Sequence, residues 1–180
     1  MFPGAINQFV ERLFQPIALG ALLLFLAPSV AALAAHGDPD WNFGEIDINP
    51  SQTLAAVLFF FLIGQVASVL GQSAFLLLRS RLEDGVPTFV RVARLVRGYP
   101  LLERRYDDIR FKVDLLCGLA GVGIVASLTE LAAALPLLPV DPAPGRIAFG
   151  LVLALLSLSA ARFHTREFLT HLRALSQETP

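Results

Sequence analysis

The residues best suited to chemistry in this sequence are polar side chains inside long apolar blocks. Gln65, Ser68 and Gln72 are spaced at i, i+3 and i+7 in one block, so a helix places them on one face. Glu130 lies near the end of another block. A carboxyl group in such a position is a candidate for ion or proton movement, with Gln65 or Gln72 as partners. The alternatives are a structural Glu130, protonated or solvated at the outer headgroups, and glutamines that pack between helices.

A second candidate is the basic segment 79–112, which holds nine of the 14 Lys and Arg residues. Within it, residues 88–97 predict a short amphipathic helix with three arginines in one arc and apolar residues opposite. Beside a membrane such a helix lies among lipid headgroups, and the alternative is an acidic cytosolic partner. We do not expect direct nucleic-acid binding, because no aromatic-interleaved basic motif is present. The candidate binding residues are Arg91, Arg94, Arg97, Arg104 and Arg105.

Motifs for known enzyme chemistry are absent from the sequence. We find no GxSxG, P-loop, HExxH or strand-associated GxGxxG pattern. The single cysteine, Cys117, lies in an apolar block without metal ligands beside it, and the three histidines have no ligand spacing. Asp107 and Asp108 match no defensible cation motif. The sequence therefore predicts a protein that is not an enzyme and holds no cofactor or metal.

Hydropathy predicts the fold class. The chain is 55% hydrophobic with a mean hydropathy of +0.64, and its apolar residues form continuous blocks. We expect one all-α domain, an integral membrane four-helix bundle with spans at about 17–35, 54–78, 113–135 and 147–161. Pro16 suits a first helical turn, Pro28 would kink the first span, and the fourth span is short at about 22 Å. Segment 79–112 forms a cytoplasmic helical extension between the second and third spans.

Small residues and one long periodic pattern predict how the helices pack. From Leu101 a helix should run without interruption into the third span, because one face repeats at alternating spacings of 4 and 3. That face consists of Leu102, Tyr106, Ile109, Val113, Leu116, Ala120, Gly123, Ser127 and Glu130. Small residues allow close helix approach, within the bundle or between copies in a homo-oligomer. The candidate packing residues are Gly64, Gly71, Gly123, Gly150 and Ala154.

Charge placement predicts the orientation in the membrane. Residues 36–53 carry four acidic groups and no Lys or Arg. If the four blocks are spans, 13 of the 14 basic residues fall on one side, Arg146 being the exception. Because basic loops stay in the cytoplasm, both termini and segment 79–112 are expected there, in a multi-pass protein of a bacterial inner membrane.

Two fragments carry a resemblance to a group of known proteins. "FFLIGQVASVLGQ" (60–72) and the downstream "RLVRGYP" (94–100) resemble a pattern of small four-span bacterial membrane proteins. Some of these are membrane partners in antiphage systems, like the membrane subunit of Kiwa. The resemblance implies a membrane subunit that works with a cytosolic partner, and it transfers no catalytic residue.

These observations leave two functional hypotheses. The first is a non-enzymatic, self-associating membrane protein that anchors or assembles a cytosolic protein through its basic 79–112 segment, in a bacterial defence or stress complex. The second is a channel or membrane-permeabilising subunit that uses the Gln65–Ser68–Gln72 face and Glu130.

Overall fold

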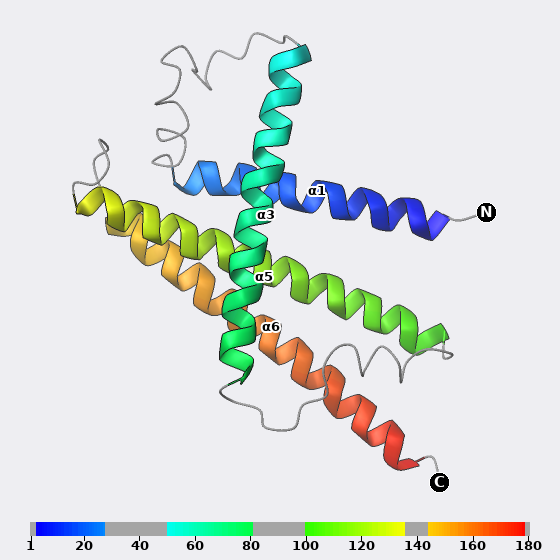
Figure 1. The fold of residues 1–180 in the computed structure, drawn as a ribbon. Coiled ribbons are helices and arrows are strands. Elements are labelled where there is room, and N and C mark those ends of the chain that lie inside the picture. The colour runs from blue at the N-terminus through cyan, green and yellow to red at the C-terminus, as the bar shows by residue number, and fades with distance from the viewer. Residues whose placement is uncertain (1–2, 28–49, 81–99, 136–143, 179–180) are drawn as a thin grey trace.

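The fold is all-α within the part of the chain that the structure, a computed structural model, describes: residues 3–27, 50–80, 100–135 and 144–178. Its four helices are α1 (Pro3–Leu26), α3 (Pro50–Ser80), α5 (Pro100–Ala134) and α6 (Pro144–Glu178). Each begins at a proline, whose fixed φ and missing N–H suit the first helical position. The all-α prediction is confirmed for these residues, and α5 runs unbroken through the expected extension into the third apolar block (Figure 1).

Three of the helices are long and apolar enough to cross a membrane. These stretches are Thr53–Leu78, Leu102–Ala134 and Pro144–Thr170, while the apolar part of α1 within the described residues, Leu13–Leu26, is shorter. Large apolar side chains cover their outer surfaces; Leu77 of α3 is 69% exposed and Leu156 of α6 is 66% exposed. A contiguous apolar exterior of this kind suits contact with lipid rather than water.

Two expected helix boundaries are wrong. Pro16 lies inside α1 and not in the first turn of a span beginning at residue 17, and α1 ends at Leu26, before Pro28. This end fits the steric bias against helix in the residue preceding a proline. The remainder of the expected first span, residues 28–35, lies outside the described residues. The fourth block, 147–161, is the middle of a 35-residue helix, because the charged tail continues the same helix.

The helices pack mainly as neighbours in chain order, and α6 runs back along α5 in the opposite direction (Figure 1). α3 crosses both α1 and α5, while α6 lies along α5 and touches α3 only slightly (Figure 1). α1 also contacts α5. The start of α1 and the end of α6 lie on the same side of the molecule (Figure 1).

Three buried clusters follow one another along α5. The first joins Leu23 of α1, and Ala27 directly after it, with Ala67 of α3 and Ala126 of α5, among others. The second joins Phe75 of α3 to α5 and α6, through residues that include Val113, Cys117, Leu158 and Ala161. The third joins only α5 and α6, through Tyr106, Phe168 and Leu169. The core therefore narrows from four helices to two toward the beginning of α5.

Candidate functional site

The second cluster lies near the end of the apolar stretch of α3, which reaches Leu78. Phe75, Val113 and Ala161 pack together there, one from each of α3, α5 and α6. Basic residues lie close to these positions in the sequence, namely Arg79, Lys112 and Arg162. Lys and Arg are typical of the ends of apolar spans, and both α5 and α6 continue past these basic residues.

α5 and α6 continue side by side through a segment that we call the two-helix extension and define as residues 102–112 and 162–170. Its core is the third cluster, with Leu102 and Ile109 packed against it. The rings of Tyr106 and Phe168 lie 5.9 Å apart between centroids, with an interplanar angle of 42°. Aromatic pairs at such distances contribute beyond their buried area, so the charged segment stands on a packed support.

The exposed surface of this extension carries the charges. Arg104 and Arg105 are both exposed on α5, as their proposed binding role requires. Two weak ion pairs lie on the surface, Arg110 with Asp114 and His164 with Glu167, each at 3.9 Å and partly solvated. Exposed pairs of this kind contribute roughly 0–1 kcal/mol, and the second forms only when His164 is protonated, so neither pair adds much to the stability of this segment. Arg91, Arg94 and Arg97 lie outside the described residues.

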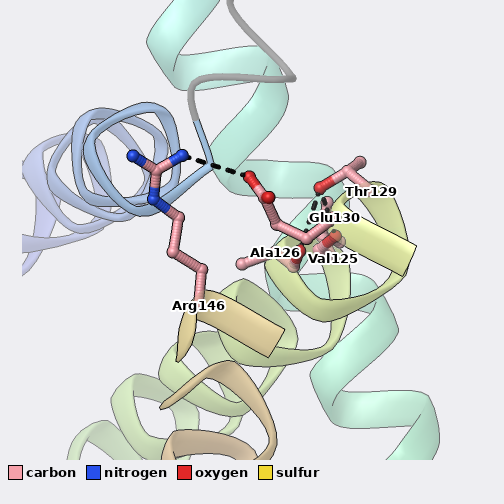
Figure 2. Close-up of polar contacts among 5 residues, drawn as sticks. All are labelled: Val125, Ala126, Thr129, Glu130 and Arg146. Atoms are coloured by element: carbon pink, nitrogen blue, oxygen red, sulfur yellow. Dashed lines mark hydrogen bonds and ion pairs between the residues drawn. The ribbon is translucent and has the colours of Figure 1, made fainter. Parts of the chain in front are cut away.

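Glu130 occupies the opposite end of the apolar stretch. It lies 17 residues after Val113, a rise of about 26 Å in a helix, close to the far edge of a ~30 Å hydrocarbon core. Its side chain is 0% exposed, and Oε1 lies 3.6 Å from Nη1 of Arg146 in the first turn of α6 (Figure 2). Arg146 is 46% exposed, so the pair joins a buried anion to a partly solvated cation.

Neighbouring groups fix the helical turn around Glu130. The Thr129 hydroxyl donates back to the backbone carbonyls of Val125 and Ala126 at 2.9 and 3.1 Å (Figure 2). The Ser127 hydroxyl lies 2.8 Å from the Gly123 carbonyl oxygen and 3.1 Å from that of Ile147, so it links α5 to the start of α6. The ion pair and this hydroxyl together hold the two helices at one end.

This geometry corrects the expected environment of Glu130. A headgroup-solvated carboxyl is wrong, because the side chain is completely buried. Gln72 is also wrong as a partner: its neighbour Gly71 packs at Cys117, 13 residues from Glu130, which is about 20 Å along α5. Sequence reasoning missed Arg146 as the partner. Its position at the start of the next apolar block, across one short connection, was the available signal.

The polar face expected on α3 is divided between the interior and the surface. Gln65 and Ser68 are half-buried, and Gln72 is exposed. Ser68 lies beside Gly118 of α5, and a Cβ added to Gly118 would come close to the Ser68 hydroxyl. The three side chains of this face therefore differ in exposure, and Gln72, the exposed one, lies far along α5 from Glu130.

Glycines make three close helix crossings. At the α1–α3 crossing, a Cβ on Gly20 would overlap the carbonyl of Phe60, and one on Gly64 would overlap that of Pro16. On each helix the two contacting residues are four positions apart, so the backbones of the two helices touch at two successive turns.

The other two crossings repeat this arrangement. Between α3 and α5, a Cβ on Gly71 would overlap the Cys117 carbonyl and one on Gly121 would overlap the Ala67 carbonyl. Between α5 and α6, Gly123 lies against Gly150 and Ala154, both of which are buried. All five glycine and alanine positions expected to pack thus lie at crossings inside one chain, while Gly20, Gly118 and Gly121 were missed.

Comparison with protein-family models, with curated proteins and with solved structures finds no match for this chain. Within the described residues, no group of three His, Cys, Asp or Glu side chains is placed to hold a metal ion.

Proposed function

We propose that this chain is a non-enzymatic, self-associating four-span protein of a bacterial inner membrane that anchors a cytosolic protein. The observation that supports the proposal is the two-helix extension, in which α5 and α6 stay packed together in a charged part of the sequence. Its core residues Tyr106 and Phe168 are 7% and 3% exposed, so the extension is a packed element. A partner would bind a preformed surface and lose little conformational entropy in doing so.

The charge distribution supports a cytosolic position for this element. Segment 79–112 and the tail 162–180 together contain 12 of the 14 basic residues. Such segments remain on the cytoplasmic side of a membrane. Arg104 and Arg105 then present guanidinium groups from a rigid helix, and guanidinium binds carboxylates with two parallel hydrogen bonds. We therefore expect an acidic surface on the partner, and the resemblance of residues 60–72 and 94–100 favours a defence or stress complex.

Charge reversal tests the anchor. The variant Arg104→Glu/Arg105→Glu should lose a cytosolic protein that co-purifies with the wild-type chain from its own host, measured by quantitative mass spectrometry of gently solubilised complexes. Glu103→Arg/Asp107→Arg is the matched control, because it alters exposed charges on the same helix in the opposite sense. Membrane insertion is checked for both variants. A second variant, Arg91→Glu/Arg94→Glu/Arg97→Glu, is measured in the same way. The anchor role is wrong if both charge-reversal variants retain every co-purifying cytosolic protein.

The channel hypothesis retains one supporting observation, the exposed amide of Gln72 on α3. Glu130 lends it less support, because that carboxylate is buried and paired with Arg146. The purified chain in liposomes tests it directly. Ion flux above that of empty liposomes would favour a channel, and its absence over a range of pH and voltage would exclude one.

A further inference from the structure

One face of α3 remains outside the packing of the chain. The buried positions of α3 form a single stripe, Gly64, Ala67, Gly71 and Phe75, which faces α1 and α5. The adjoining surface carries Val69 and Leu76, each 58% exposed. Such residues suit contact with lipid or with a second apolar helix.

Gln72 interrupts this apolar surface. At 100° per residue it lies between the buried stripe and Val69 and Leu76, and it is exposed. Gln65 and Ser68 continue the same side of α3 as half-buried groups. An amide offers two donors and an acceptor, and hydrocarbon satisfies none of them.

The described residues do not supply a partner for the Gln72 amide. The neighbouring exposed Ser73 donates to the Val69 carbonyl at 2.8 Å, so its hydroxyl is satisfied within α3. The Gln72 side chain makes no comparable hydrogen bond within the described residues. Arg79, which follows the apolar run, lies seven residues further on, about 10 Å along the helix. A glutamine side chain is shorter than this distance.

We propose that this face of α3, centred on Gln72 with Val69 and Leu76 beside it, is the interface between two copies of the chain. A two-fold axis along the membrane normal places equivalent residues at the same depth, so Gln72 of one copy faces Gln72 of the other. The amide is self-complementary, because each copy donates one N–H and accepts another. The flanking apolar side chains then exclude water from this reciprocal pair. The inference rests on the self-association included in the proposed function, and it assigns that property to one helix face.

Dimerisation of the purified full-length chain in lipid bilayers tests this assignment. Labelled protein is diluted with increasing lipid, and resonance energy transfer measures the fraction of dimer. Gln72→Leu should weaken dimerisation roughly tenfold, as expected for one or two interhelical hydrogen bonds. Gln72→Asn, which keeps an amide, should weaken it less. Ser73→Ala is the matched control and should leave it unchanged, because that hydroxyl bonds within its own helix.

Two results would overturn the inference, and they differ in what else they remove. If the wild type and the Gln72→Leu variant dimerise equally well, the interface lies elsewhere and self-association remains intact. Wild-type protein that is monomeric at all lipid dilutions would remove self-association as well. Neither result bears on the cytosolic anchor, because no soluble partner is present. Leucine at a lipid-facing position adds apolar surface, so loss of folding does not explain a weaker dimer.

Discussion

The buried ion pair shows how one side chain constrains the pairing of α5 and α6. Glu130 is removed from solvent, whereas Arg146 keeps about half of its side-chain surface exposed. Removing one member of a buried pair leaves an uncompensated charge, which costs more than the intact pair contributes. The two residues are therefore unequal: loss of Arg146 leaves a buried anion, and loss of the Glu130 charge leaves a cation that still reaches water.

Substitution at the two positions should show this asymmetry. Arg146→Leu should destabilise the chain by about 3 kcal/mol, since Glu130 then remains buried without its cation. Glu130→Gln should cost less, because it removes the buried charge itself. The double variant should be more stable than Arg146→Leu alone. Reversible unfolding in mixed micelles measures the free energy of unfolding of all three variants. An Arg146→Leu chain as stable as the wild type would contradict a stabilising role for the Glu130–Arg146 pair.

Sequence periodicity was sufficient to predict the buried face of α5, but not the residues that this face contacts. The residues from Leu102 to Glu130 that repeat at spacings of 4 and 3 are all buried or half-buried in the structure. That pattern lies within one helix, so it requires no knowledge of the other helices. The pairing of Glu130 with Arg146, and of Gly121 with Ala67, depends on how two helices cross. Crossing positions are set by three-dimensional packing, which the order of residues along one helix does not determine.

At the scale of helices, the three glycine crossings replace large interdigitating side chains. Between apolar helices in lipid there is no hydrophobic gain from association, so close backbone contact and dispersion must hold them together. Gly71 and Gly121 allow α3 and α5 to touch at two successive turns. The small residues thus serve the internal packing of the chain, which leaves the exposed side of α3 for contact with lipid or another copy.

One added methyl group should separate α3 from α5. Gly121→Ala places a Cβ against the backbone carbonyl of Ala67, which cannot move aside as a flexible side chain would. We expect a loss of about 1–3 kcal/mol, the usual cost of overpacking. Gly145→Ala is the matched control, because nothing lies within 4 Å of a Cβ there. It should be neutral or slightly stabilising, since alanine favours helix over glycine.

The same micelle unfolding measurement distinguishes the two glycine variants. A Gly121→Ala chain with unchanged stability would show that the α3–α5 crossing is wider than the structure has it. Equal losses at Gly121 and Gly145 would indicate that glycine flexibility matters more than close approach.

For the whole molecule, helix packing fixes which helix ends lie together, and charge placement predicts on which side of a membrane they would lie. At the crossing of α3 and α5, residue numbers increase along one helix and decrease along the other, since Ala67 meets Gly121 and Gly71 meets Cys117. The two-helix extension then lies at the end where basic residues gather. The acidic segment 36–53 falls on the opposite side if α1 and α3 both cross the membrane.

Cysteine labelling from each side of the membrane tests this orientation. Cys117 is 1% exposed, so the wild-type chain should react little with a membrane-impermeant maleimide. Arg105→Cys on α5 and Arg166→Cys on α6 should react in inverted vesicles and not in intact spheroplasts, because both positions are exposed on the extension. Asp40→Cys should react only in spheroplasts. Labelling of positions 105 and 166 from opposite sides would contradict the antiparallel pairing of α5 and α6. Labelling of position 40 from the cytoplasmic side would instead show that α1 and α3 do not both cross.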